Sequence, residues 1–364
     1  MRIERVRLFS YTLPLVRPIT MLGDAMSARE GFVVALTDDS GETGWGEMAG
    51  IPGRSTDHDL IFLRFEFADA AAKMVKVQIH DGRSLEDLLG TTIPWRVKPS
   101  ALMGLESALL TLVARRKNLP FAELISRKHS DHVAINSLIE TQDRFGERVT
   151  EIIDEGARAV KLKVGRQSVE DDIDLVHHVR RAFPPFVRLR LDANRRWSMD
   201  EAVAFASGIE GVDIEYIEEP LINHTQLEEL HMKAPHLPLA IDETVRAMSP
   251  DDVRSAAYLK AVVLKPSMIG GIRMTVAFVR ACRESGKTPV ISSSIESSIG
   301  LSVLAHLSAA LTPGTPSGLD TARLFSRDLL SPGFPIGRSR VALDELYPAV
   351  GVIDMSLLKE IPLE

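Results

Sequence analysis

Cysteine is almost absent from this sequence: Cys282 is the only one among 364 residues. A single thiol excludes an intramolecular disulfide, which stabilises many small secreted proteins, so we expect a reducing, cytoplasmic environment. Apolar runs of about 20 residues, the length that spans a bilayer, are also missing. Residues 1–5 lack the continuous apolar core of a signal peptide. We therefore expect neither secretion nor contact with a membrane.

Positive charge is in deficit: the chain has 43 Lys and Arg residues against 50 Asp and Glu residues, which gives a formal net charge of −7. No basic run or stripe of basic and aromatic residues offsets this deficit, which argues against a nucleic-acid partner. Hydrophobic residues make up 45% and charged residues 26% of the chain, the balance of a globular protein with a large core. We expect a small-molecule substrate as partner, and the sequence leaves open whether the chain forms a homo-oligomer.

The N-terminal part of the chain has the pattern of strands followed by helices. Strands are predicted at residues 3–13, 31–36 and 41–47. Turn chemistry at residues 38–41 joins the last two as a hairpin. Residues 14–29 are predicted to be a long loop, either a functional lid or a mobile connection. Helices are predicted at residues 58–77 and 100–116, the second with one apolar stripe that packs in the core.

From about residue 131 the pattern becomes strand, turn and helix, repeated. Strands are predicted near residues 132–138, 158–164, 187–192, 213–218, 238–241, 260–265, 288–292 and 316–319. Eight strands at a spacing of roughly 25 residues predict a parallel barrel, with a doubly wound open sheet as the alternative. We expect an α+β domain at residues 1–99, completed by residues 331–364, and a barrel domain at residues 100–330.

Charged residues stand at the ends of consecutive predicted strands, namely Lys163, Asp192, Glu218, Asp242 and Lys265. In a parallel barrel the C-terminal ends of the strands meet on one face, where active sites lie. Three carboxylates brought together there would repel one another unless a hard divalent cation such as Mg²⁺ neutralises them. The sequence therefore predicts a metal site flanked by two lysines, with Mn²⁺ as an alternative ion.

Lys161 and Lys163 share one face of a predicted strand because side chains alternate with period two. Burial of two ammonium groups requires compensation by carboxylates, a metal site or an anionic ligand. A nearby cation lowers the pKa of a lysine, which suits a base that works near neutral pH. We expect a lysine to remove the α-proton of a carboxylate substrate and the metal to stabilise the resulting enediolate.

Several neighbouring residues allow more than one interpretation. A strand-end Asp taken singly is more often a helix cap or turn residue, but caps do not explain three acids on successive strands. Glu219 and Glu243 stand beside Glu218 and Asp242 and complicate the choice of ligand, although alternation sends Glu218 and Glu219 to opposite faces of the strand. Asn194 continues the face of Asp192 and is predicted to hydrogen-bond Lys163 and to contact the substrate. Arg190 lies one layer deeper and is predicted to orient the acids, bind a substrate carboxylate or form a structural ion pair.

Small residues at 292–300 follow the seventh strand and open a helix. Such residues leave backbone N–H groups accessible, and a helix N-terminus attracts anions. We predict that an anion binds at Ser292 and Ser294, with a further amide from Gly318. Simple N-capping of the helix is the alternative.

These pieces together resemble the enolase superfamily, in its muconate-lactonizing-like branch. The matching segments are Lys161-Leu162-Lys163, Leu191-Asp192-Ala193-Asn194, Ile217-Glu218-Glu219-Pro220, Ile241-Asp242-Glu243, Leu264-Lys265-Pro266-Ser267 and Gly270-Gly271. The resemblance implies an α/β fold, a modified TIM barrel (β/α)₇β with an α+β capping domain. It also implies Mg²⁺ on Asp192, Glu218 and Asp242. The catalytic lysines would be Lys163 and Lys265, with Lys161 in support.

Within this branch the chain looks most like the o-succinylbenzoate synthase family of menaquinone biosynthesis, on the segments 292–301 and 318–321 and on Arg190. The resemblance implies a hydro-lyase that catalyses syn dehydration of 2-succinyl-6-hydroxy-2,4-cyclohexadiene-1-carboxylate. Lys163 would act as base and then as acid, and Lys265 would stabilise the enediolate by a cation–π contact. Amides near Ser292 and Gly318 would hold the succinyl carboxylate. In the family, the capping segments at residues 14–29 and 50–56 set specificity.

Other activities remain open. Dipeptide epimerases of the branch carry an Asp-x-Asp after the eighth strand, and here Asp320-Thr321-Ala322 lacks the second acid. N-acylamino acid racemisation needs two lysines on opposite faces of the substrate, which this chain would supply. A barrel scaffold without catalysis is the alternative from another class, although a scaffold has no need of cations at strand ends.

Overall fold

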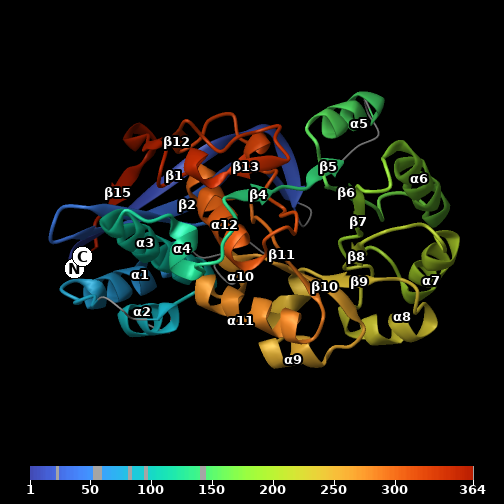
Figure 1. The fold of residues 1–364 in the computed structure, drawn as a ribbon, viewed down its shortest axis with the longest axis horizontal. Coiled ribbons are helices and arrows are strands. Elements are labelled where there is room, and N and C mark those ends of the chain that lie inside the picture. The colour runs from blue at the N-terminus through green and yellow to red at the C-terminus, as the bar shows by residue number, and fades with distance from the viewer. Residues whose placement is uncertain (22–23, 52–59, 81–83, 94–96, 140–144, 364) are drawn as a thin grey trace.

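The computed structural model describes residues 1–21, 24–51, 60–80, 84–93, 97–139 and 145–363 (Figure 1). An antiparallel sheet with its helices occupies one end of the molecule, and a parallel sheet surrounded by helices occupies the other. The fold is mixed α/β, as predicted. The division into domains at residues 99 and 331 stays a prediction.

The antiparallel sheet contains four strands in the order β15-β1-β2-β3. Their bounds are Lys359–Ile361, Ile3–Met21, Asp24–Asp38 and Thr43–Met48. The predicted hairpin between β2 and β3 is confirmed, and its turn is held by the Asp38 carboxylate, which accepts hydrogen bonds from the amides of Ser40 and Glu42. Strand β15 pairs with β1, so the end of the chain returns to the N-terminal sheet.

The prediction of a long loop at residues 14–29 is wrong. Strands β1 and β2 continue through this region as an antiparallel ribbon, in which Ile19 pairs with Met26. The register shifts between Pro14 and Ile19. Proline lacks the N–H that a ladder needs and is tolerated at such irregularities. The two prolines, Pro14 and Pro18, therefore interrupt the pairing without ending the strands.

Four helices follow the sheet: α1 Leu60–Met74, α2 Leu85–Thr92, α3 Pro99–Lys117 and α4 Phe121–Ile125. Helix α3 was predicted with one apolar stripe, but every residue from Ser100 to Ala114 is buried. It packs on β2 and β3 and also on α10 and α11 of the barrel. A Cβ atom on Gly46 of β3 would lie 2.0 Å from the carbonyl oxygen of Gly104, so only glycine permits this approach.

Glu106 of α3 is buried and caps helix α11, Gly271–Glu284, of the barrel. Its Oε2 accepts hydrogen bonds from the amides of Ile272 at 2.5 Å and Arg273 at 3.2 Å. Gly271 has φ +80°, and a Cβ there would lie 2.4 Å from Glu106 Oε2. Burial raises the pKa of Glu106 to about 7, against the lowering effect of Arg273.

This raised pKa predicts a pH dependence of stability. Because the folded chain holds the Glu106 proton up to about pH 7 and the unfolded chain loses it near 4.5, stability decreases as pH rises between these values. Between pH 5.5 and 8.5 we expect Glu106 to remove about 2 kcal/mol from the free energy of unfolding. Urea titration of Glu106→Gln should give a curve that falls less with pH, whereas Glu210→Gln, at an exposed acid, should keep the wild-type slope. Equal slopes in all three proteins would refute the assignment.

The parallel sheet contains seven strands in the order β11-β10-β9-β8-β7-β6-β5. Their bounds, from β5 to β11, are Ser137–Ile139, Ala159–Lys163, Arg188–Asp192, Tyr216–Glu218, Leu239–Ile241, Leu259–Leu264 and Thr288–Ile291. The predicted eighth strand forms two parallel bridges, Gly318 with Ser292 and Ser317 with Ile135. These bridges connect the two edges of the sheet, so the chain closes as a (β/α)₇β barrel rather than an open doubly wound sheet.

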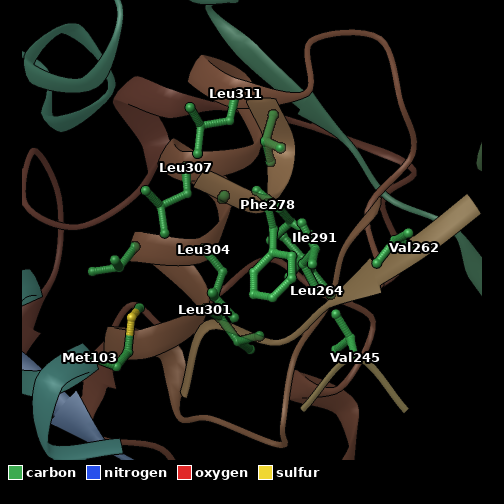
Figure 2. Close-up of a cluster of buried hydrophobic side chains, with 14 of the residues drawn as sticks. Met103, Val245, Val262, Leu264, Phe278, Ile291, Leu301, Leu304, Leu307 and Leu311 are labelled. Atoms are coloured by element: carbon green, nitrogen blue, oxygen red, sulfur yellow. The ribbon is translucent and has the colours of Figure 1, made fainter. Parts of the chain in front are cut away.

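The barrel helices are α5 Phe145–Asp154, α6 Val169–Ala182, α7 Met199–Gly208, α8 Leu227–Lys233, α9 Pro250–Ser255, α10 Pro266–Ile269, α11 and α12 Ser298–Leu311. Their apolar faces meet the sheet, as Figure 2 shows for Phe278 of α11 and Leu304 of α12 against Leu264 and Ile291 of the strands. Outside the barrel, β4 His132–Ala134 pairs with β13 Arg340–Ala342, and β12 Leu330–Ser331 pairs with β14 Val352–Ile353. Within the described ranges, no helix has both the length and the apolar character to cross a membrane.

Candidate active site

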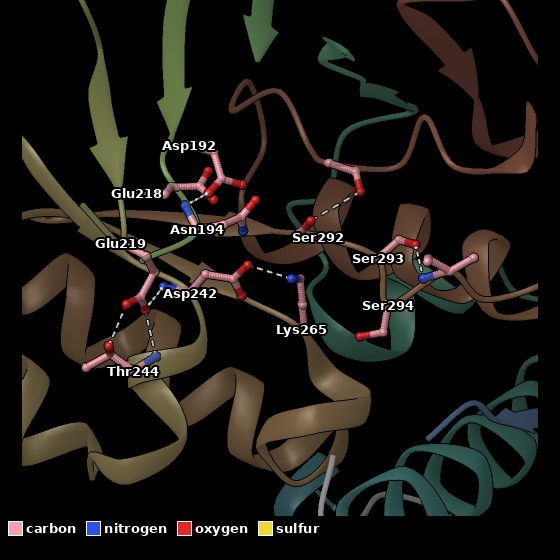
Figure 3. A network of polar contacts seen from close by, with 12 residues as sticks. Asp192, Asn194, Glu218, Glu219, Asp242, Thr244, Lys265, Ser292, Ser293 and Ser294 are labelled. Carbon is pink, nitrogen blue, oxygen red and sulfur yellow. Dashed lines mark hydrogen bonds and ion pairs between the residues drawn. The ribbon is translucent and has the colours of Figure 1, made fainter. Parts of the chain in front are cut away.

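The barrel brings the predicted lysines and acids to one end of the sheet, where Figure 3 shows Lys265 with the three acids. Lys163 at the end of β6 is in register with Asp192 of β7, which is in register with Glu218 of β8. Asp242 follows β9 directly, and Lys265 follows β10. Five charged residues therefore come from five neighbouring strands, at the face where active sites of parallel barrels form.

Lys161 and Lys163 bind the same carboxylate oxygen. Lys161 Nζ lies 2.8 Å from Asp192 Oδ2 and 2.6 Å from Glu218 Oε2. Lys163 Nζ lies 2.6 Å from Asp192 Oδ2 and 2.7 Å from Asn194 Oδ1. The prediction that Asn194 binds Lys163 is confirmed.

Lys265 approaches the acids from the other side of the barrel. Its Nζ lies 2.5 Å from Asp242 Oδ2. Lys163 ends the second strand of the eight-stranded barrel and Lys265 the sixth, so these two strand ends lie across the barrel axis from each other. A molecule bound in the cavity between Lys163 and Lys265 would have an amine on each side.

The site couples its charges strongly. Burial alone would raise the pKa of Asp192, but the ammonium groups of Lys161 and Lys163 hold it well below its usual range. Burial raises the pKa of Glu218 to about 7, against Lys161, and the charges of Asp192 and Asp242 add to the rise. The three carboxylates therefore repel one another in a setting from which water is largely excluded.

The pKa values of Lys161 and Lys265 are raised by the same acids. Burial would lower the pKa of Lys161 and of Lys265, yet the carboxylates raise both, with Asp242 acting on each. The sequence predicted that a nearby cation lowers the pKa of a lysine, but the protein groups alone raise the pKa of both lysines. A cation that shares the same carboxylates would withdraw part of their effect on the lysines.

The donor set fits a hard divalent cation. Asp192, Glu218 and Asp242 are 2%, 1% and 5% exposed, and all three offer oxygen without sulfur or imidazole. Mg²⁺ prefers such ligands. In the described part of the chain, no group of three acidic, His or Cys side chains is placed to hold a metal ion as it stands. Lys161 binds Glu218 and Lys265 binds Asp242 instead. The metal ligands stay a prediction that the chemistry of the donors supports.

Glu218 and Glu219 have separate tasks. Glu219 has φ +43° and is fully buried, with its carboxylate turned away from the lysines. It accepts hydrogen bonds from the amides of Asp242 at 2.9 Å and Thr244 at 2.7 Å (Figure 3). Arg195 Nε lies 2.8 Å from the same carboxylate. Glu219 therefore fixes the backbone that carries Asp242. Alternation along the strand separated the two glutamates, but nothing in the sequence assigned Glu219 this task.

Asp192, Asp242 and the three lysines Lys161, Lys163 and Lys265 line a cavity of about 260 Å³. Five apolar side chains also line the cavity and are here called the apolar wall: Ile19, Ile51, Leu138, Ile295 and Leu324. Ile19 belongs to the ribbon predicted as a loop, so this segment does cover the site. Of the predicted specificity segment 50–56, residues 52–56 lie outside the described part of the chain.

The backbone amides predicted to be open at Ser292, Ser294 and Gly318 all have acceptors, so that part of the prediction is wrong, while substrate binding by these residues stays a prediction. The amides of Ser292 and Gly318 donate to Leu264 and Ile291 carbonyls, both at 2.9 Å. The Ser294 amide donates to Glu296 Oε2 at 2.5 Å. At the start of α12, Glu47 accepts the amides of Ser297 and Gly300, and Asp328 accepts that of Ser298. Ser292 and Ser294 line the cavity, but with amides that already have acceptors.

Arg190 forms the structural ion pair that was one of its predicted alternatives. It is fully buried below the site, with Nε 2.6 Å from Glu215 Oε2. Its Nη1 donates to Asn136 Oδ1 and to the Pro316 carbonyl. Arg190 is not among the residues that line the cavity. The hydrogen bond to Pro316 links the third barrel strand to the segment of the eighth.

Comparison with known proteins gives two family matches. Residues 144–351 match the Enolase C-terminal domain-like family, and residues 3–112 match the family described as MenC, N-terminal domain. The chain is 31% identical to o-succinylbenzoate synthase of Yersinia enterocolitica, over 87% of this chain and 90% of that protein. It is 29% identical to Protein PHYLLO, chloroplastic, of Arabidopsis thaliana, over 93% of this chain, but it spans only 22% of that protein.

Solved structures resemble the whole fold. Muconate lactonizing enzyme from Pseudomonas fluorescens superposes with a TM-score of 0.81 at 21% identity, covering 98% of this chain and 99% of that chain. N-succinyl Arg/Lys racemase from Bacillus cereus gives a TM-score of 0.81 at 20% identity and covers 100% of both chains. A family match over more than half the residues and a relative above 30% identity along most of the length show that the chain belongs to the enolase superfamily.

Proposed function

We propose that the chain is an o-succinylbenzoate synthase. This carbon–oxygen lyase would convert a single substrate, 2-succinyl-6-hydroxy-2,4-cyclohexadiene-1-carboxylate, into 2-succinylbenzoate and water. The observation that carries the chemistry is the pair of amines, Lys163 and Lys265, across one cavity from each other beside three buried carboxylates. The names of relatives similar to the chain over most of its length support this substrate over others.

The first step of the proposed reaction is proton removal by Lys163. Its Nζ is oriented by Asp192 and Asn194 at 2.6 and 2.7 Å, which directs the amine into the cavity. Lys161 Nζ shares Asp192 Oδ2 with it. Lys163 would take the proton on the carbon next to the substrate carboxylate.

The second step is loss of the hydroxyl group. Lys163, now protonated, would return its proton to the departing hydroxyl on the same face of the ring, so that water leaves by syn elimination. The C–H bond breaks in the first step and the C–O bond in the second, a ring double bond forms, and aromatisation makes the overall reaction favourable. One amine therefore serves as base and acid in turn.

Lys265 and the acids would stabilise the charge that develops between the two steps. The ammonium of Lys265, held by Asp242, faces the other side of the ring and stabilises negative charge there by a cation–π contact. A divalent cation on Asp192, Glu218 and Asp242 would supply positive charge to the substrate carboxylate. The apolar wall of the cavity suits the carbon ring of the substrate.

A second candidate reaction is racemisation of N-acylamino acids, which the same two amines favour. One lysine would remove the α-proton and the other would return a proton on the opposite face. The chain lacks the second acid of an Asp-x-Asp after the eighth strand, which disfavours dipeptide substrates.

The test is to add the cyclohexadiene substrate with Mg²⁺ and to follow aromatic product by absorbance. We expect turnover that EDTA abolishes and that Mg²⁺ or Mn²⁺ restores. Separately, N-succinyl amino acids in D₂O would be followed by NMR for α-proton exchange. Exchange without dehydration would replace the proposal with racemase, and absence of both reactions would leave a non-catalytic barrel.

A further inference from the structure

Arg29 of β2 is a buried cation that does not line the cavity but binds two of the segments that do. It is 1% exposed. Its Nε donates to the carbonyl of Ile295 at 3.1 Å, and its Nη1 donates to the carbonyl of Gly50 at 2.8 Å and to that of Glu30 at 2.7 Å. Ile295 and the residue after Gly50, Ile51, belong to the apolar wall.

Ile295 has a backbone conformation that its side chain disfavours. Its φ is +63°, in the left-handed region that β-branched residues avoid. Such a conformation persists only where surrounding contacts enforce it. Two contacts do so here: Ser293 Oγ accepts the Ile295 amide at 2.8 Å, and Arg29 binds the Ile295 carbonyl. The guanidinium therefore helps to keep the Ile295 side chain in the wall of the cavity.

The planar guanidinium suits this task because it presents several N–H donors in fixed directions. One end of it holds the segment before Ile51, from the antiparallel sheet, and the other holds the loop after β11 of the barrel. Both segments are thereby fixed relative to each other. A lysine would carry the same charge but could not reproduce both directions, and a methionine would fill the space without donating.

We propose that Arg29 is a positioning residue that fixes Ile51 and Ile295 as an apolar wall, and that this wall makes the site selective for a carboxylate attached to a flat carbon ring. The selectivity rests on the proposed function, whereas the fixing of the wall does not. Loss of Arg29 should loosen the wall, weaken binding of the ring and leave the lysines and acids in place.

The experiment compares Arg29→Met and Arg29→Lys with Arg7→Met. Arg7 lies on β1 of the same sheet, and its guanidinium binds Glu360 away from the cavity. Hydrogen–deuterium exchange reports the wall directly. We expect peptides that cover residues 46–51 and 292–297 to exchange about tenfold faster in both Arg29 variants and at the wild-type rate in Arg7→Met.

Steady-state kinetics measure how loss of Arg29 changes substrate binding. In the Arg29 variants we expect KM for the cyclohexadiene carboxylate to rise about tenfold with kcat within about threefold of wild type. Ile295→Gly, which removes the side chain and suits the positive φ, should reproduce the rise in KM without loss of stability, even if Arg29→Met folds poorly.

Unchanged exchange in the Arg29 variants would overturn the inference. Faster exchange with unchanged KM, or an equal loss of kcat and kcat/KM, would overturn the role in selectivity. If the wild-type protein turns over no substrate, the proposed function fails, and the exchange measurement alone decides whether Arg29 fixes the wall.

Discussion

Replacement of Lys163 by methionine should lower the rate of dehydration about 10³-fold, the scale on which a positioned base contributes. Methionine fills a similar space but cannot accept a proton. Asn194 and Asp192 lose one partner each, while Lys161 still binds Asp192 and Glu218, so the fold should persist. Since Lys163 is not a predicted metal ligand, calorimetric titration should give Mg²⁺ affinity at least equal to that of the wild-type protein.

The matched control is Lys260→Met, at an exposed lysine of β10. This variant loses the same charge and should retain wild-type kcat in the absorbance assay. A Lys163→Met protein that dehydrates at the wild-type rate would contradict the choice of base. Equal losses in both variants would point to net charge rather than to one amine.

Replacement of Glu47 by alanine should lower the free energy of unfolding by about 3 kcal/mol or more, because several buried donors lose their acceptor together. Glu47 of β3 is 2% exposed. Its carboxylate accepts the Ser297 amide at 2.9 Å, the Ser297 hydroxyl at 2.6 Å and the Gly300 amide at 2.9 Å, and Tyr11 donates to it as well. A residue of the N-terminal sheet thus caps helix α12 of the barrel, where a negative charge is favoured.

Urea unfolding measures this contribution. Glu47→Gln retains one acceptor oxygen and should fall between alanine and wild type. Glu42→Ala, at a partly exposed glutamate that pairs with Arg115 before the same strand, should stay within about 0.5 kcal/mol of wild type. A loss of less than about 1 kcal/mol in Glu47→Ala would show that the cap contributes little to stability.

The sequence predicted the barrel and the ring of charged residues because both follow from local patterns. Side-chain alternation placed Lys161 and Lys163 on one face, and each strand end supplied its own charged residue. Parallel pairing then brings consecutive strand ends together, so Asp192 and Glu218 could be placed side by side without any knowledge of loops. The structure has these residues in register.

The errors arose where contacts join segments far apart in the chain. Open amides at the start of α12 were a reasonable expectation from small residues alone. The acceptor that occupies them, Glu47, comes from a strand about 250 residues earlier, as the sequence separation of the Glu47 and Ser297 contact shows. The ribbon at residues 14–29 was missed for a different reason: prolines favour a loop locally, but pairing across the ribbon overrides them.

Glu219 and Arg29 illustrate the remaining limit. Both are buried charged residues that bind backbone groups of other segments, the amides of Asp242 and Thr244 for Glu219 and the carbonyls of Gly50 and Ile295 for Arg29. Backbone groups are the same in every residue, so such partners leave no trace in the sequence. The positions that shape a site are therefore harder to predict than the groups that act in it.

Anomalous diffraction from crystals soaked in Mn²⁺, an ion that shares the oxygen preference of Mg²⁺, would locate the cation. The account predicts one ion bound by Asp192, Glu218 and Asp242, with the amines of Lys163 and Lys265 on opposite sides of the adjoining cavity. An ion bound to other residues, or crystals that take up no ion at this face of the barrel, would contradict it.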